Sequence, residues 1–439
     1  MAGETDLRWG NDENSLGALR SSPDTDDGLF GTSGFAGTID GIVIRDVLGR
    51  VPLFVERDRF DWAPAVERAG RDAPLGAVEY ESARDLPTDE VFGVLQSAGS
   101  RHNDQPFDDS RSGDTTVSDS RSGNTTFSDS VPGESWSHRP TALTDPVTLP
   151  AGCAATVTTI EPVWQLTHPP AAADQDAVVD RIDAAIRSGV DRAATASSVV
   201  AFSGGVDSAL LAATCDRPLY VVGFPDSHDV DAAHSAARAM GVEDRLHCRT
   251  LSIDDVERAV PTVARAIGRT NAMDVAIALG MYLVAEAAAD DGYDRLLCGQ
   301  GADELFGGYE KVGRLDHRVE ATSVRDAVFE QIRTVPEQVS RDVLAIEAAG
   351  VRPIVPYLGD DVVAPALTLS ESRLVSASTR KVTLRRIAAA SLPRSVAYRE
   401  KKALQYGSLV SRELDRLARQ AGYKRRMDDH VRRYVESRL

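Results

Sequence analysis

The loop Ser203-Gly204-Gly205-Val206-Asp207-Ser208 follows a short apolar run and opens a second apolar segment. This pattern is typical of the turn between a buried strand and a helix. Two adjacent glycines allow a sharp bend and a close approach of the backbone to a ligand, and the free N–H groups and dipole of a helix start favour negative charge. The loop is therefore expected to bind phosphates, with Ser203 and Ser208 as hydroxyl donors. The alternative is an ordinary Gly-Gly turn with an N-cap serine.

Asp207 places a carboxylate where a polyanion is expected, which is favourable only if a divalent cation lies between the two. We therefore predict that Asp207 is a Mg²⁺ ligand. The sequence contains no GxxxxGK[ST] motif, and the first lysine of the chain is Lys311, far beyond the loop. The missing P-loop lysine argues against transfer of a terminal phosphate.

A second glycine-rich stretch has the same organisation, Leu296-Leu297-Cys298-Gly299-Gln300-Gly301-Ala302-Asp303-Glu304-Leu305-Phe306-Gly307-Gly308-Tyr309. A short apolar strand again runs into a loop, and Asp303 stands near the start of the next helix. Ligands of open α/β sheets bind at the carboxyl ends of the strands. Asp207 and Asp303 are therefore predicted to meet at one edge of a parallel sheet and to hold one Mg²⁺ ion together.

The first loop resembles the SGGxDS loop of the N-type ATP pyrophosphatases (PP-loop enzymes), and the second stretch resembles the SGEGADELFGGY signature of the asparagine synthetases. The resemblance to the asparagine synthetase family covers residues 140–410, and more weakly residues 28–90. It implies a ligase that uses ATP and Mg²⁺ to adenylate a carboxylate, expected to be aspartate. Pyrophosphate would be released and the adenylate amidated with ammonia.

The resemblance also implies which residues bind the nucleotide. The adenine is expected beside Val222, at the end of the neighbouring strand. The residues expected to contact ATP or pyrophosphate are Phe202, Ser203, Gly204, Gly205, Asp207, Ser208, Val222, Cys298 and Gly299.

A basic stretch, Arg399-Glu400-Lys401-Lys402-Ala403-Leu404-Gln405-Tyr406-Gly407, resembles the family's RxKxxxxxG segment. Adenylation adds negative charge to the α-phosphate and to the attacked carbonyl, and a positioned ammonium stabilises that charge. The chain has only five lysines: Lys311, Lys381, Lys401, Lys402 and Lys424. We expect Lys401 to be catalytic, with Lys402 as the alternative and a solvated basic turn as the non-functional interpretation.

One position departs from the family pattern. The glutamate of the GEGADE motif, to which the family assigns a part in proton movement during amide formation, is Gln300 here. Glutamine can hold a hydrogen bond but cannot act as a base. Either solvent or product phosphate removes the proton from ammonia, or the enzyme acts on a different carboxylate. A nucleotide-binding regulatory protein that has lost catalysis is the third hypothesis, disfavoured by the intact Asp207, Asp303 and Lys401.

The fold class is expected to be α/β, with a doubly wound, mostly parallel sheet in the synthetase domain. Strands and helices alternate along the chain, which implies right-handed crossovers. Strands are predicted at 198–202, 219–224, 246–251 and 295–298. Helices are predicted at 175–193, 208–215, 229–240, 253–267 and 273–290, with one charged amphipathic helix at 410–439.

A smaller, truncated α+β domain of the Ntn-hydrolase type is expected before the synthetase domain. Residues 37–54 predict two strands around a turn and resemble the RDxxGxxPLYY hairpin of the family's glutaminase domain. Position 2 is Ala2 rather than the nucleophilic cysteine that such a glutaminase needs, and no cysteine precedes Cys153. The domain is therefore expected to lack glutaminase activity.

The predicted domain boundaries follow from these assignments. They are an acidic leader at 1–27, the degenerate glutaminase-like domain at 28–96, an insert at 97–140, a return segment at 141–170 and the synthetase domain at 171–439. The insert contains a ten-residue duplication rich in Ser, Asp, Gly and Thr and is expected to be disordered.

Composition limits the partners. With 67 acidic against 49 basic residues and a formal net charge of −18, binding to nucleic acid or to an anionic membrane is not expected. Many acids and few lysines resemble proteins kept soluble in a salt-rich cytoplasm. Cys153, Cys215, Cys248 and Cys298 lack zinc-ligand spacing and are expected to be free thiols. With no signal peptide and no apolar run of membrane-spanning length, a cytoplasmic location is expected. A separate ammonia source and a homodimer are both compatible with the sequence.

Overall fold

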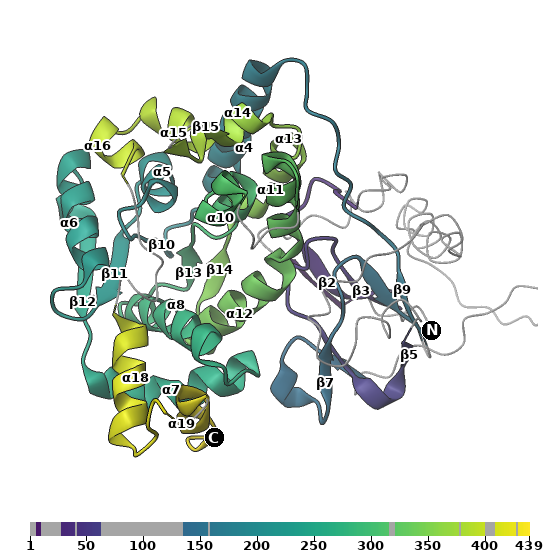
Figure 1. Cartoon of the computed structure of the whole chain (residues 1–439), viewed down its shortest axis with the longest axis vertical. Coiled ribbons are helices and arrows are strands. Elements are labelled where there is room, and N and C mark those ends of the chain that lie inside the picture. The colour runs from purple at the N-terminus through teal and green to yellow at the C-terminus, as the bar shows by residue number, and fades with distance from the viewer. Residues whose placement is uncertain are drawn as a thin grey trace, which may run out of the picture.

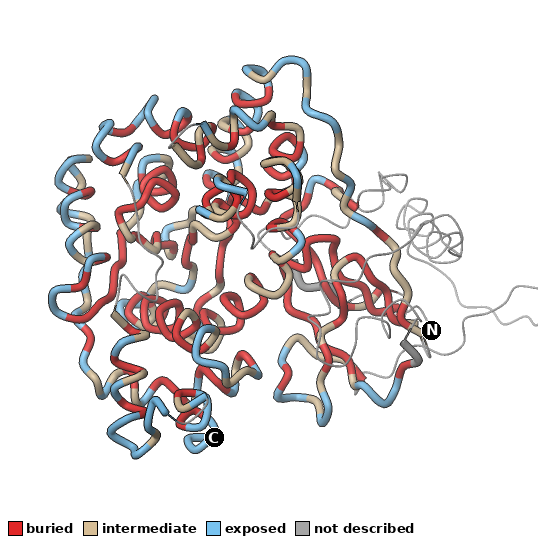
Figure 2. Tube along the Cα trace, in the orientation of Figure 1, coloured by how far each residue is buried: buried red, intermediate tan, exposed pale blue. Residues whose placement is uncertain are grey.

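The structure is a computed structural model, and it describes residues 6–9, 28–39, 42–62, 135–156, 159–315, 321–376, 379–399, 409–426 and 429–439. A larger α/β part begins at residue 175, and a smaller part made of short strands precedes it (Figure 1). Buried residues follow the central strands of both parts and the inward faces of the surrounding helices (Figure 2).

The larger part contains a five-stranded parallel sheet in the order β12-β11-β10-β13-β14. Its three inner strands, β11, β10 and β13, are almost entirely buried, as expected for a parallel sheet covered on both faces. Four strands confirm the sequence prediction, and β14 is an additional one. Their bounds are β10 Ser198–Ala201, β11 Leu219–Gly223, β12 Leu246–Thr250, β13 Arg295–Leu297 and β14 Arg352–Ile354.

Helices cover both faces of this sheet, so the predicted doubly wound α/β architecture is confirmed. Helices α5 and α6 pack against β10 and β11, whereas α8 packs against β11 and against α12, which contacts β14. The side chains of Asp174, Ser227, Ser252 and Asn271 cap helices α4, α6, α7 and α8. The bounds are α4 Gln175–Ala193, α5 Val206–Thr214, α6 His228–Met240, α7 Ile253–Ile267, α8 Ala272–Asp290 and α12 Val335–Ala348.

The side of the sheet on which the chain adds its next strand changes at β10. From β10 the chain adds β11 and β12 on one side, then returns to place β13 and β14 on the other. The loops that follow β10 and β13 therefore diverge from neighbouring strands at a topological switch point, where open α/β sheets bind their ligands.

Shorter helices complete the carboxyl-terminal half. The segment predicted as one helix over 410–439 is two helices, α18 and α19, because Gly422 with φ 95° lies in the turn that follows α18. The bounds are α9 Ala302–Leu305, α10 Glu310–Arg314, α11 Val324–Arg333, α13 Asp360–Ala366, α14 Glu371–Leu374, α15 Val382–Ala389, α16 Arg394–Ala397, α18 Val410–Gln420 and α19 His430–Glu436. The two-stranded ribbon β15 Val375–Ser376 and β16 Thr379–Arg380 precedes α15.

Helix α8 is long and apolar enough to cross a membrane by length and composition alone, a test that the core helix of a soluble protein also meets. However, 67% of its most apolar window is buried inside the protein. It packs against α7, α12, α18 and β11. Its apolar composition is thus explained by a central position in the core.

The smaller part consists of two sheets. One has the strand order β1-β2-β3-β8-β9-β5, and the other has the order β6-β4-β7. The range 37–54, predicted as two strands around a turn, contains most of the β2–β3 hairpin and the first residue of β4, which belongs to the other sheet. The bounds are β1 Asp6–Trp9, β2 Phe35–Ile39, β3 Ile42–Arg45, β4 Phe54–Glu56, β5 Asp61–Trp62, β6 Trp136–Ser137, β7 Pro146–Thr148, β8 Cys153–Ala155 and β9 Thr159–Pro162.

Two predicted boundaries need correction. Residues 6–9 were assigned to a loose leader, but they form β1 and pair with β2 in antiparallel register. Strand β6, at the end of the predicted insert, pairs with β4. The rest of the leader up to residue 27 and the ten-residue duplication lie outside the described residues.

Buried arginines join the two parts. Arg50 Nη1 donates to Asp360 Oδ1 at 2.6 Å and to the Leu358 carbonyl at 2.7 Å, and its Nε donates to Asp46 at 2.8 Å. Arg45 Nη2 donates to Ser340 Oγ on α12 at 2.6 Å. Both guanidinium groups are almost completely buried. The small strand-rich part is therefore attached to helix α12, which borders the cavity described below, and to the turn between β14 and α13.

Candidate active site

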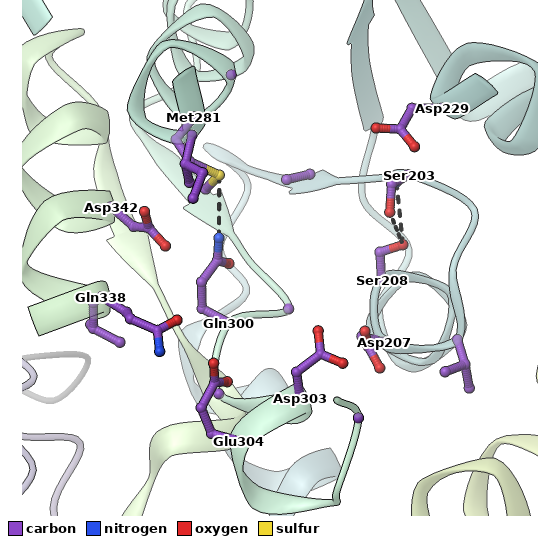
Figure 3. A pocket seen from close by; sticks show the side chains of 18 of the residues that line it. Ser203, Asp207, Ser208, Asp229, Met281, Gln300, Asp303, Glu304, Gln338 and Asp342 are labelled. Carbon is purple, nitrogen blue, oxygen red and sulfur yellow. Dashed lines mark hydrogen bonds between the residues drawn. The ribbon is translucent and has the colours of Figure 1, made fainter. Parts of the chain in front are cut away.

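The loop after β10 bends at two glycines. Gly204 has φ 69°, and a Cβ atom there would overlap the carbonyl of Ala232, so glycine is required both for conformation and for space. Gly205 is the N-cap of α5. The Ser208 hydroxyl lies 3.3 Å from the Ser203 amide and 3.4 Å from the Ser203 hydroxyl (Figure 3). The loop thus places both hydroxyl groups at the start of a nine-residue helix.

The loop after β13 lies directly against the first one. A Cβ atom on Gly299 would be 3.1 Å from Cβ of Asp207. Gly301 adopts φ 88° at the start of α9, where a side chain would overlap Leu358. These two glycines allow the second loop to pack on the first and to direct Asp303 toward Asp207.

Asp207 and Asp303 share one cation, and that cation is Lys381. Its Nζ lies 2.8 and 2.7 Å from the two carboxylate oxygens of Asp207 and 2.7 Å from Asp303 Oδ1. Although burial opposes the charged form, the two carboxylates raise the pKa of Lys381 above its ordinary value. The prediction that the two loops bring both aspartates together is consistent with this geometry, because one ammonium group contacts both.

Lys381 was not assigned to the site from the sequence. It precedes α15 with φ 56°, an uncommon conformation for a residue with a side chain. Gly308 lies beside it, and a Cβ atom at this position would overlap both Asp303 Oδ1 and Cε of Lys381. The sequence offered one indication of a role for Lys381: the chain has only five lysines, so each of them is a candidate for a specific function.

The same two carboxylates suit a magnesium ion. Among the described residues, no group of three or more His, Cys, Asp or Glu side chains could hold a metal ion. Mg²⁺ is commonly bound by one or two carboxylates together with substrate phosphates and water. Asp207 and Asp303 therefore fit this ion, provided that the Lys381 ammonium shifts from its position between them.

A cavity of about 660 Å³ opens beside the two loops. The predicted residues that line it are Phe202, Ser203, Asp207, Ser208, Val222, Gly299, Gln300 and Asp303. Gly204 and Gly205 belong to the loop without lining the cavity. Cys298 does not line it either: its side chain is buried, its Sγ lies 3.5 Å from the Leu296 carbonyl, and burial raises the pKa of its thiol. Lys401 and Lys402 lie outside the described residues.

Glu304 is another titratable residue in the cavity wall, besides Asp207, Asp303 and Lys381. Its carboxylate is buried and accepts a hydrogen bond from the Tyr309 hydroxyl. Burial, followed by the charge of Asp303, raises the pKa of Glu304 to about 7. Gln300 lies nearby and donates from Nε2 to the sulfur of Met281 at 3.2 Å (Figure 3).

Supporting contacts come from β14 and from α8. Tyr357, in the turn after β14, is fully buried, and its hydroxyl donates to the Asp207 carbonyl at 2.8 Å. Asp274, near the start of α8, accepts from Arg341 Nη1 at 2.9 Å and from Arg269 Nη1 at 3.1 Å. Although burial opposes ionisation, hydrogen bonds from Asn271 and Arg341 hold the pKa of Asp274 below its ordinary value.

Comparison with known proteins agrees with this geometry. The family model described as asparagine synthase matches residues 180–333 and 327–436. The chain belongs to the asparagine synthase family. The matched residues include both loops, Lys381 and the helices that surround the cavity, so the sequence-based recognition of the family is confirmed.

Individual relatives match over about half of their length. A putative asparagine synthetase (glutamine-hydrolyzing) of Methanocaldococcus jannaschii is 31% identical over 267 residues, which are 52% of this chain and 49% of the relative. Asparagine synthetase B of Escherichia coli is 25% identical over 47% of this chain and 41% of its own length. An asparagine synthetase of Arabidopsis thaliana is 25% identical over 47% of this chain and 39% of its own length.

Proposed function

We propose that the protein is an AMP-forming amide ligase that adenylates a carboxylate with release of pyrophosphate and then forms an amide with ammonia. One observation carries this proposal: two glycine-bent loops from adjacent strands direct Asp207 and Asp303 at a single cation position beside a helix start. That arrangement suits the phosphates of ATP and a bound metal ion.

In this proposal Asp207 and Asp303 hold Mg²⁺, which when bound neutralises phosphate charge. Ser203, Ser208 and the free N–H groups at the start of α5 bind the outer phosphates, because all of them are hydrogen-bond donors and both serines line the cavity. Lys381 is held close enough to the two aspartates to contact the same phosphates. The adenine lies beside Val222. Lys401, outside the described residues, keeps its predicted role of stabilising charge on the α-phosphate.

Aspartate is the first acceptor to test, because the relatives named above are asparagine synthetases. A different carboxylate is the second candidate, and Gln300 favours it because the family's glutamate is absent at that position. Free ammonia is the proposed nitrogen donor. Cys153, the first cysteine of the chain, is buried within β8 of the strand-rich part, which does not suit an exposed glutaminase nucleophile.

The test is pyrophosphate release by the purified full-length protein with ATP, Mg²⁺ and a panel of carboxylic acids. Acid-dependent formation of AMP and pyrophosphate supports the proposal, and ADP as product would contradict it. Glutamine in place of ammonium should give no amide and no free glutamate. Asp207→Asn should abolish acid-dependent pyrophosphate release. Asp290→Asn removes a carboxylate of the same type at the exposed end of α8 and serves as the matched control.

A further inference from the structure

Two neighbouring helices contribute apolar residues to the cavity. Those of α8 follow the i, i+4, i+7, i+8, i+11 pattern of one helix face and are Met273, Ile277, Gly280, Met281 and Val284. Helix α12 packs against α8 and adds Val335 and Val339, four positions apart. In Figure 3 Met281 lies on the side of the cavity opposite Ser203 and Asp207. The phosphate-binding loop therefore faces apolar side chains across the cavity.

The adenine accounts for only part of this apolar surface. Val222 on β11 is the residue proposed to lie beside the adenine, and α8 contacts β11. Helix α12 instead contacts β14, and two strands, β10 and β13, separate β11 from β14 in the sheet. Val335 and Val339 thus lie on the β14 side. Met281 contacts the loop after β13, because its sulfur accepts from Gln300 Nε2 at 3.2 Å. These residues border the space that the adenine leaves for the acid.

The charged side chains of the same two helices neutralise one another. Arg341 donates to Asp274 Oδ1 at 2.9 Å and to Asp342 Oδ1 at 2.8 Å. Arg269, which precedes α8, donates to Asp274 Oδ2 at 3.1 Å. Two arginines therefore balance two aspartates. Among the described residues, Arg341 is the basic residue that α8 and α12 contribute to the cavity, and two carboxylates already share it.

Most of the other basic residues belong to the phosphate side. Three of them lie in or just before α15, where Lys381 is held between the two site aspartates. Arg399 donates to the Ala232 carbonyl at 2.6 Å, and a Cβ atom on Gly204 of the phosphate-binding loop would overlap that carbonyl. Lys311 lies over the Tyr309 ring. The basic residues of the cavity outside α8 and α12 are Lys311, Arg380, Lys381, Arg385 and Arg399.

We propose that the acid adenylated by this protein is a monocarboxylate with an apolar body, held against Ile277, Met281, Val335 and Val339. A second carboxylate, as in aspartate, would be buried near Asp342 without a cation of its own, and burial of an unpaired charge is costly. An alkyl or aryl body gains there by leaving water. The inference rests on the proposed function, and it selects the second of the two acceptor classes named there.

The first experiment compares matched acids in the exchange of labelled pyrophosphate into ATP. The pairs are succinate with butyrate, adipate with hexanoate, and aspartate with 3-aminobutyrate, so that a methyl group replaces one carboxylate in each. The monoacid of each pair should have a kcat/KM higher by about tenfold or more. Each methylene added from butyrate to hexanoate should raise kcat/KM by about fourfold. Equal or higher values for the diacids would overturn the inference and leave the proposed function intact.

The second experiment changes the apolar residues. Ile277→Ala should lower the ratio of kcat/KM for hexanoate to that for butyrate by about fourfold, because it removes apolar surface from the acid site. Ile253→Ala is the matched control, since Ile253 on α7 is also partly buried but does not line the cavity. The control should leave the ratio unchanged, and circular dichroism shows whether each variant retains the fold. An unchanged ratio in both Ile277→Ala and Val339→Ala would overturn the inference.

Lys311→Met tests the remaining cation. If Lys311 paired with a second carboxylate of the acid, this variant would lose activity with aspartate and keep it with hexanoate, and that result would contradict the monocarboxylate. We expect equal effects on both acids.

Failure of the proposed function is distinguishable from failure of this inference. If no acid supports pyrophosphate exchange in the wild type, the adenylation proposal is wrong. Calorimetric titration with hexanoate and with adipate, in the presence of Mg²⁺ and a non-hydrolysable ATP analogue, then tests the acid site directly. Binding of hexanoate that is weakened in Ile277→Ala supports the inference. Absence of hexanoate binding, or equal binding of adipate, overturns it.

Discussion

Replacing Lys381 with methionine should make the stability of this protein depend on magnesium. The Lys381 ammonium is 8% exposed and neutralises Asp207, which is 10% exposed, and Asp303, which is 47% exposed. Breaking a buried ion pair by removing one partner costs about 3–5 kcal/mol, because the remaining charge is left uncompensated. Since about half of the surface of the Asp303 side chain is exposed to solvent, the lower end of this range applies, about 3 kcal/mol.

For a domain of this size, about 1 kcal/mol shifts Tm by about 2–4 °C, so Lys381→Met should lower Tm by about 6–12 °C in EDTA. Added Mg²⁺ should recover most of this loss, because the ion can then occupy the position between the two carboxylates. The wild type should respond less to Mg²⁺, since the ion must first displace an ammonium group. Thermal unfolding followed by circular dichroism at constant ionic strength measures both effects.

Lys311→Met is the matched control for this experiment. Lys311 also borders the cavity, but its Nζ lies over the Tyr309 ring, 5.7 Å from the centroid, rather than between carboxylates. Its loss should change Tm by a small amount that does not depend on Mg²⁺. Equal destabilisation of Lys381→Met with and without Mg²⁺ would refute the reasoning, and so would an unchanged Tm in EDTA.

Three further predictions concern other parts of the structure. Gly308→Ala should abolish pyrophosphate release while leaving the circular dichroism spectrum intact, because its Cβ would overlap Asp303 and Lys381; full activity would contradict that overlap. Arg50→Met should destabilise the protein by about 3–5 kcal/mol by leaving Asp46 and Asp360 without their buried cation, and an unchanged unfolding midpoint would count against this. Hydrogen bonds from Arg425, followed by those from His430 and Arg419, hold the pKa of Asp415 below its ordinary value. Its contribution is therefore fully present above the unfolded-state pKa of about 3.9 and is lost progressively as the pH falls from there through the lower folded-state pKa. Asp415→Asn should accelerate hydrogen exchange in α19 more at pH 7 than at about pH 2, and equal acceleration at both would disprove it.

Much of the fold follows from local pattern. The short apolar runs at β10, β11, β12 and β13 and the amphipathic segments between them are recognisable from periodicity, and helix α4 has the predicted bounds. Strand β14 was missed because three residues that contain Pro353 give little local signal. Its place in the sheet is set by pairing with β13, which is a tertiary contact.

The site was predictable where the chemistry lies in contiguous sequence. Asp207 and Asp303 stand in glycine-rich loops, and those loops indicate both the ligand and the place of binding. Lys381 lies 174 residues from Asp207, and no local pattern connects them. Tertiary packing of α15 against α4, α5, α14 and α16 places this lysine between the two loops.

The position of Lys381 gives the two loops a counterion that belongs to the chain itself. Helix α15 begins immediately after this residue, so the ammonium is carried by a helix that packs on α5. Part of the charge of Asp207 and Asp303 is thus balanced by a covalently attached group. Assembly of the two loops therefore does not require a divalent ion to be present while the protein folds.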